Sequence, residues 1–188
     1  YVIVSSYVDG ISLENYVGEY GAIDVRHTSW IISRLLNATG YLYSCAKVHG
    51  HINPKNIFLQ SKHQLVLVGS NFSGVQPATI GVDDYEKAFM PSEQIAGERV
   101  LPESDFFSLG ASVIYALTGG DLEAVKRNKI PEDVPRSIAE FIRLLTKKKS
   151  EYRPRWEDEP NPVDRFDRIR SELGDPSQFD REPLPGLE

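Results

Sequence analysis

The chain has 188 residues, of which 40% are hydrophobic, and its net charge at neutral pH is −6. A single cysteine excludes an internal disulfide, and no apolar run approaches the roughly 20 residues that a membrane-spanning helix needs. The composition therefore predicts a soluble globular protein with a sizeable core, without a membrane segment.

The negative charge is concentrated at the C-terminal end. Residues 157–188 hold ten acidic residues against four arginines, so residues 1–156 are balanced. Because there is no basic excess, we expect no nucleic-acid partner. Five prolines in residues 157–188 indicate an acidic segment beyond a domain of residues 1–156. We expect one short helix at residues 163–173, with the last dozen residues mobile or draped over the domain.

The N-terminal third predicts a strand and two helices. YVIVSSYV, residues 1–8, has the β-branched and aromatic character of a strand. Ser12 is expected to cap a helix that starts with LENYV. Residues 28–47 repeat apolar residues at helical spacing and predict a long, mostly buried helix. Cys45, in the apolar run YLYSCAKV, is expected to be a buried structural thiol.

The rest of the folded part predicts a hairpin, a loop and further helices. NIFLQ and QLVLVG, separated by three residues, read as a β-hairpin. Residues 70–92 predict a long irregular loop. The residues from 104 to 120 are apolar nearly all round, as in a central helix, and an amphipathic helix follows at residues 135–148. This order predicts an α+β fold that is mainly helical.

Five motifs, in this order, resemble those of protein kinases. YVIVSSYVDGISLENYV resembles the hinge strand and the helix after it, and VHGHINPKNIFL resembles the catalytic loop. MPSEQ resembles the APE motif, SDFFSLG the signature of the central helix, and EYRP the segment that carries a structural arginine. Residues 1–156 are thus similar to the helical C-terminal lobe of a protein kinase, with most of the N-terminal lobe absent from this chain.

The resemblance implies architectural roles for four residues. Glu93 and Arg153 would form an ion pair that ties the end of the long loop to a distant helix. Asp105 would be a buried acid that accepts hydrogen bonds from the backbone around His49 and Gly50. A simple helix cap is the alternative for Asp105, and His49 matches the structural histidine of the family.

The positions that carry chemistry depart from the family pattern. Phosphoryl transfer needs a carboxylate at the attacking hydroxyl and a cation on the phosphate. The resemblance places His51 at the base position and Asn53 at the position of the phosphate-binding lysine. Asn56, which would help to hold a metal, is retained. We therefore expect catalysis to be impaired.

The metal-binding aspartate is also missing. Counting from Asn56 at the family spacing, the DFG triplet falls on residues 69–71, where Gly69 replaces the aspartate. A second register, residues 71–73, offers Asn71 instead. A neutral amide is a poor magnesium ligand, so we expect magnesium binding to be weak or absent.

Nucleotide binding stays an open alternative. By resemblance, the backbone near Ser6 and Val8 would face an adenine, Ser5 would be the gatekeeper, and Ser12 and Phe58 would lie nearby. Phe58 could equally be a plain core residue.

No metal site is predicted. Three of the histidines, His49, His51 and His63, together with Cys45, lack the paired spacing that is typical of zinc sites.

Three functions agree with these features. The first is a pseudokinase domain that binds or regulates a protein partner, for which a kinase or a kinase substrate is one candidate. The second is a divergent Ser/Thr kinase that transfers phosphate from ATP, uses His51 or reassigned residues, and has its small lobe upstream of this chain. The third is a half-kinase that pairs with the small lobe of another kinase. The chain starts at Tyr1 without a signal or transit pattern, as an intracellular fragment would, so we expect a cytoplasmic protein.

Overall fold

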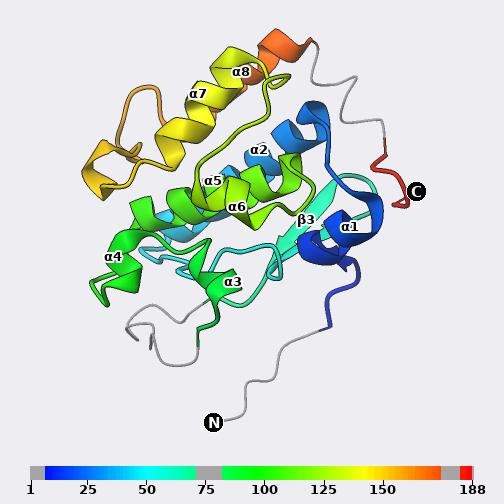
Figure 1. Cartoon of the computed structure of the whole chain (residues 1–188). Helices are drawn as coiled ribbons and strands as arrows, with labels where there is room; N and C mark the ends of the chain where they lie inside the picture. The colour runs from blue at the N-terminus through cyan, green and yellow to red at the C-terminus, as the bar shows by residue number, and fades with distance from the viewer. Residues whose placement is uncertain (1–6, 71–81, 175–182, 188) are drawn as a thin grey trace.

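The computed structural model describes residues 7–70, 82–174 and 183–187. It is mainly helical with one small sheet, which confirms the predicted α+β class (Figure 1). The elements are β1 (Ile11–Ser12), α1 (Leu13–Tyr20), α2 (Val25–Ser44), β2 (Ile57–Gln60), β3 (Gln64–Leu67), α3 (Asp84–Lys87), α4 (Ser92–Ile95), α5 (Pro102–Leu117), α6 (Leu122–Lys126), α7 (Arg136–Leu145) and α8 (Pro162–Arg170), with 3-10 turns at Ser150–Tyr152 and Ser171–Leu173. Most of the strand expected at residues 1–8, with Ser5 and Ser6, lies outside the described residues, and Val8 has no regular structure.

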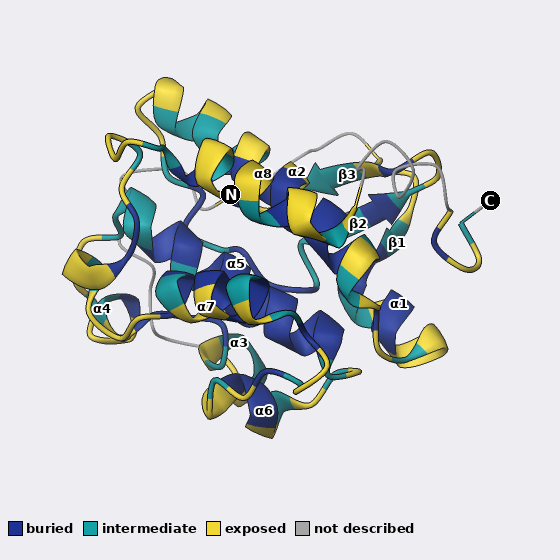
Figure 2. Ribbon diagram, turned by 90° about the horizontal axis from the view of Figure 1, so that it is seen from above, coloured by how far each residue is buried: buried dark blue, intermediate teal, exposed yellow. Residues whose placement is uncertain are grey.

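Helix α5 runs through the centre of the fold. From Ser104 to Leu117, every residue except Phe107 is buried. Helices α2, α6 and α7 pack against it, and it is dark over most of its length in Figure 2. The predicted central helix is confirmed, and it begins at Pro102 because proline suits the first helical position.

Helix α2 begins and ends three residues earlier than predicted. Asp24 starts it, because its carboxylate accepts hydrogen bonds from the backbone N–H groups of Arg26 (2.9 Å) and His27 (3.2 Å). At the other end, Ala46 has a left-handed φ of 54° and the chain turns away. The prediction that Cys45 is buried was wrong: it follows the last helical turn and is exposed. No helix in the described ranges is long and apolar enough to cross a membrane.

The three strands form one antiparallel sheet in the order β1, β2, β3. The predicted hairpin is confirmed, and its turn contains Lys62 and His63, both with positive φ. Ile57 and Leu59 are buried on the core side of β2. Phe58, on the other side, is half-buried and in register with Ser12 and Val66. The sheet therefore presents a partly apolar outer face.

The described parts of the C-terminal segment pack against the domain. Helix α8 contacts α2 and α7, and the ring centroids of Phe166 and Phe141 lie 4.9 Å apart. Farther on, Leu184 is buried, and the Tyr16 hydroxyl donates a hydrogen bond to the Pro185 carbonyl at 3.1 Å. The predicted short helix is confirmed, whereas the boundary at residue 157 stays a prediction.

Three short helices were not expected. The described part of the predicted loop at residues 70–92 includes α3, which has four residues. Helix α4 has the same length, and α6 has five residues. Asp83 caps α3 by accepting a hydrogen bond from the Glu86 N–H at 2.7 Å. Helices of four or five residues complete barely one turn, so they show no periodicity in the sequence.

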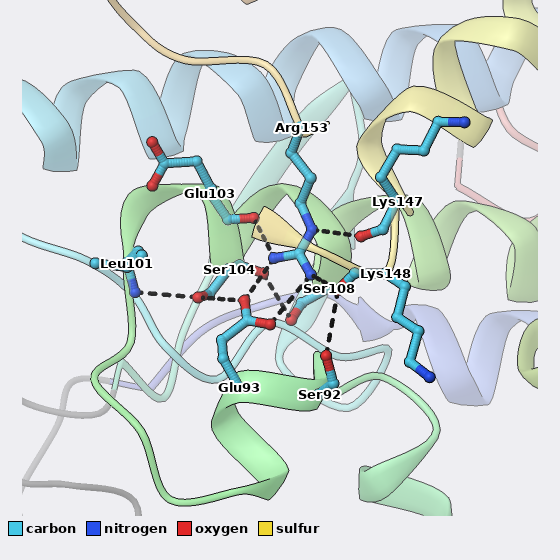
Figure 3. A network of polar contacts seen from close by, with 9 residues as sticks. All are labelled: Ser92, Glu93, Leu101, Glu103, Ser104, Ser108, Lys147, Lys148 and Arg153. Carbon is cyan, nitrogen blue, oxygen red and sulfur yellow. Dashed lines mark hydrogen bonds and ion pairs between the residues drawn. The ribbon is translucent and has the colours of Figure 1, made fainter. Parts of the chain in front are cut away.

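The ion pair between Glu93 and Arg153 joins α4 to the segment after α7 (Figure 3). Arg153 donates to both carboxylate oxygens, at 2.5 and 3.2 Å, and its side chain is fully buried. The guanidinium also donates to the carbonyls of Lys147, Lys148 and Glu103. Every side of the buried cation therefore has an acceptor, which offsets its loss of hydration.

Glu93 is held in its ionised form by these contacts. Burial alone would raise its pKa, but hydrogen bonds from Arg153 and Ser104 lower the pKa below the usual value. Since the folded pKa is depressed, this contribution to stability is present above the pKa of the unfolded chain and is lost in acid.

We expect Glu93→Gln to lower the free energy of unfolding by about 3 kcal/mol, because it leaves the buried Arg153 charge without its counter-ion. The matched control is Glu140→Gln, which removes an exposed partner of Arg136 (2.7 Å) and should cost less than about 0.5 kcal/mol. Urea unfolding at pH 7.5 measures both values, and similar losses in the two variants would contradict the role assigned to the buried pair.

Candidate functional site

The loop that resembles a catalytic loop follows α2 and leads into β2. Its first turn is bound to Asp105 on α5, which is 3% exposed. The His49 and Gly50 N–H groups each donate to a different carboxylate oxygen of Asp105 at 2.8 Å. The contacts expected for Asp105 are therefore present. Its hydrogen-bond donors lie in the loop and not in the first turn of α5, so Asp105 does not act as a simple helix cap. Burial raises the pKa of Asp105 to about 7, against the opposite effect of these two donors.

His49 is a buried connection between the loop and the end of β3. Its Nε2 lies 3.1 Å from the Val68 carbonyl, which can only accept, so Nε2 carries the proton. Its Nδ1 then accepts a hydrogen bond from the His51 N–H at 3.2 Å. Burial lowers the pKa of His49 to about 4, so the ring is neutral at physiological pH. A neutral, doubly bonded histidine is a structural part of the loop.

Further contacts fix the rest of the loop. Gln94, buried on α4, donates to the Gly50 carbonyl at 2.8 Å. The Asn53 side chain is also buried, and its Oδ1 accepts from the Lys55 N–H at 3.0 Å. Asn53 thus stabilises the turn of its own loop. Sequence reasoning missed Gln94, for which its place beside Glu93 in the APE-like motif was the only signal.

His51, at the base position, has contacts at both ring nitrogens. The Asn56 amide donates to Nδ1 at 3.2 Å and to the His51 carbonyl at 2.9 Å, and the second contact fixes which end of the amide is the donor. Nδ1 is therefore an acceptor, and Nε2 carries the proton of the neutral ring. Nε2 lies 3.9 Å from the Glu86 carboxylate. In this arrangement neither nitrogen offers a free lone pair to a hydroxyl group.

Helix α3 covers the loop and supplies Glu86. The Tyr85 ring meets Tyr115 of α5 edge-on at 6.0 Å, and the Lys55 ammonium lies 4.5 Å from the Tyr85 ring centroid. Lys55 is also 3.7 Å from the Asp83 carboxylate. Sequence reasoning missed Glu86, because nothing in the pattern placed it beside His51.

Gly69 lies directly against Asn56, on the side where a metal-binding acid would be expected. Its φ is +72°, and a Cβ atom there would lie 2.9 Å from Asn56 Oδ1 and 3.0 Å from Cγ. A side chain at this position would be strained and would overlap the amide. The positions of the second register, residues 71–73, lie outside the described residues.

The residues considered for nucleotide binding are only partly brought together. Ser12 is buried, and its hydroxyl accepts a hydrogen bond from the Asn15 N–H at 3.2 Å, as predicted for a helix cap. Phe58 is paired with Ser12 across the sheet, and Val8 lies four residues before Ser12 in the chain. Their role in nucleotide binding stays a prediction.

The donors once considered for zinc do not gather at one point. His63 packs against the rings of Trp30 and His27, and Cys45 is exposed. Among the residues that the structure describes, no group of three or more His, Cys, Asp or Glu side chains could hold a metal ion.

The lowered pKa of His49 predicts a pH-dependent cost of His49→Gln. The unfolded chain takes up this proton near pH 6.5 and the folded chain only near pH 4, so the stability that His49 contributes is lost as the pH falls through this range. Asp105 has the opposite linkage but is present in both proteins.

The difference in unfolding free energy between wild type and His49→Gln should therefore shrink by about 2 kcal/mol from pH 7 to pH 5. Urea unfolding at the two pH values measures it. A constant difference would mean that the pKa of His49 is the same in the folded and unfolded chains, as expected for an exposed ring.

Comparison with known proteins agrees with this architecture. The family model of the protein kinase domain matches residues 1–168. The chain is similar to serine/threonine-protein kinase F of Synechocystis sp., with 28% identity over 127 residues, covering 63% of this chain and 25% of that protein. It is also similar to serine/threonine-protein kinase PknK of Mycobacterium tuberculosis, with 31% identity over 147 residues, covering 77% of this chain and 13% of that protein. The chain thus spans a quarter or less of the length of these relatives, and the matched region, the helical fold and the anchored loop together show that it belongs to the protein kinase family.

Proposed function

We propose that this kinase-family domain does not transfer phosphate and serves as a binding or regulatory module for another protein. The observation that carries the proposal is the state of the catalytic loop. Its shape is held by Asp105, while His51, at the base position, accepts a hydrogen bond from the Asn56 amide at Nδ1 and has the Glu86 carboxylate 3.9 Å from Nε2. A cytoplasmic location is part of the same proposal.

The catalytic groups that this loop lacks normally make large contributions to the rate of phosphate transfer. A positioned general base contributes about 10²–10⁴ to the rate, and a preorganised charge about 10²–10³. His51 and Asn53 replace one of each, although losses of groups that act together do not simply add. Asn53 carries no charge, and its amide is used inside the loop. Turnover at a physiological rate is not expected.

The residues that face Asn56 do not fit the magnesium ion that kinase chemistry uses. Magnesium prefers carboxylate and phosphate oxygens in octahedral geometry. Gly69 supplies no side-chain oxygen, and a side chain there would be strained by the left-handed φ of +72° and would require the Asn56 amide to move. Nucleotide binding without magnesium, near Val8 and Phe58, remains compatible with the proposal.

A divergent Ser/Thr kinase is the second candidate, favoured by one contact. Glu86 lies 3.9 Å from His51 Nε2 and could orient the ring as a base if the Asn56 amide moved away from Nδ1. The named relatives are serine/threonine kinases, which also favours this candidate.

Phosphate transfer by the full-length protein separates the two candidates. We expect radiolabel transfer from ATP to a basic protein substrate to be equally low for wild type and His51→Ala, with either magnesium or manganese present. Transfer by the wild type that His51→Ala abolishes would overturn the proposal and establish the kinase.

Restoring the acid should fail for a structural reason. Gly69→Asp combines a left-handed backbone with a contact at 2.9 Å, whereas Gly97→Asp has the same backbone strain (φ +74°) with nothing near its Cβ. We expect a loss of about 1 kcal/mol for Gly97→Asp and at least about 2 kcal/mol more for Gly69→Asp. Thermal and urea unfolding compare the two. Equal losses would show that position 69 has room for a metal ligand.

A further inference from the structure

A cavity of about 320 Å³ lies away from the catalytic loop, among α4, α5, α6 and the segment after α7. These elements lie next to one another in Figure 1. Apolar side chains line much of the cavity, among them Met90, Phe107, Ala111 and Val125. Ile95, on α4, lines it as well and is 47% exposed. The volume is within the range of about 300–1,000 Å³ that is typical of ligand pockets.

The rim of the cavity is basic. Two segments that carry bases and no acid, residues 126–129 (KRNK) and 143–149 (RLLTKKK), both contribute lining residues. The Thr146 hydroxyl donates to the Asn128 side-chain oxygen at 3.0 Å and so joins them. Lys126 and Lys148 are the charged lining residues. This stands out in a chain whose net charge is −6.

The lysines at the rim are available to an anion. Both are exposed. Lys126 contacts Glu123 at 3.1 Å, but Glu123 is shared with Arg127, so this group keeps a positive charge. Among the residues that the structure describes, none that lines the cavity is acidic.

The cavity wall is held rigidly by the buried ion pair. The Arg153 guanidinium lies 5.1 Å from the Phe107 ring and donates to the Lys148 carbonyl at 2.9 Å. The Ser92 hydroxyl donates to the same carbonyl at 3.2 Å. Because the backbone on both sides of the cavity is fixed, a ligand would meet a preformed site and lose little free energy in ordering it.

We propose that this cavity binds a protein segment in which one large apolar side chain is flanked by carboxylates. The apolar floor would take the side chain, and Lys126 and Lys148 would pair with the flanking acids. An apolar floor favours a peptide over nucleic acid, which needs cations along a phosphate backbone. The proposal rests on the proposed binding function and names its surface and the chemistry of its partner.

The test uses the purified chain and a fluorescein-labelled peptide, GEEFEEG. We expect saturable binding by fluorescence anisotropy that weakens when sodium chloride is raised from about 50 to 500 mM, because salt screens exposed charges. Lys126→Glu/Lys148→Glu should weaken binding at least about tenfold. The matched control is Lys62→Glu/Lys47→Glu, which makes the same charge change at exposed positions outside the cavity lining and should leave binding unchanged.

A second variant tests the apolar floor. Ala111→Met would extend into the cavity from α5 and should weaken binding about tenfold with little change in the circular dichroism spectrum. If this variant fails to fold, the surface lysine variants still test the site. The peptides GQQFQQG and GEEAEEG should each bind at least about tenfold more weakly than GEEFEEG.

Several results would overturn the proposal: no binding of GEEFEEG, equal binding of the peptide without phenylalanine, or no effect of the lysine reversals. Dimerisation of the chain that Ala111→Met abolishes would assign the cavity to a second copy instead. Phosphate transfer that depends on His51 would overturn the loss of catalysis but would leave these binding results unchanged, so the two proposals fail separately.

Discussion

The buried carboxylate of Asp105 is the constraint on which the candidate site depends. A carboxyl group inside an apolar helix must find hydrogen-bond donors, and the N–H groups of His49 and Gly50 are the ones that the fold provides. These two bonds fix the first turn of the loop on the most buried helix of the domain. His49 extends the connection to β3, and Gln94 extends it to α4. The geometry of the loop therefore belongs to the packing of the core and does not require a substrate or a metal to maintain it.

This separation of architecture from chemistry explains how the loop can keep its shape while its reactive groups differ from the family pattern. The groups that hold it are backbone N–H groups and buried side chains, whereas His51 and Gly69 stand at positions that would contact substrate or metal. Asn53 stands at the phosphate-binding position but stabilises the turn of the loop. Asn56, which in the family would help to hold a metal, instead binds His51 and lies against Gly69. The same scaffold, through the Glu93–Arg153 pair, also fixes the wall of the basic cavity on the other side of α4. One set of structural contacts thus supports both the loop that resembles a catalytic loop and the proposed docking site.

Much of the fold could be predicted from sequence, because long elements leave a periodic signal. Helices α2 and α5 and the β2–β3 hairpin are long enough, or patterned enough, to be recognised. The order of the kinase-like motifs predicted that Asp105 accepts hydrogen bonds from the loop. It also predicted the Glu93–Arg153 ion pair. The predictions that failed concern local turns of the chain and contacts between residues far apart in the sequence. Cys45 is exposed because α2 ends at Ser44, before the apolar pattern stops, and the chain turns away at Ala46. Helix α3 is too short to leave a pattern, so the contact of Glu86 with His51 had no signal. The close approach of Gly69 to Asn56 depends on the backbone geometry, which cannot be predicted by counting residues along the sequence.

The central claim is that the kinase scaffold is retained without a working magnesium–nucleotide site. The most direct measurement compares the thermal unfolding of the full-length protein with ATP alone and with ATP plus magnesium. A site without an acid at position 69 should give no additional stabilisation when magnesium is added, whether or not the nucleotide itself binds. A clear rise in melting temperature that requires magnesium together with ATP, and that is absent with magnesium alone, would contradict the account.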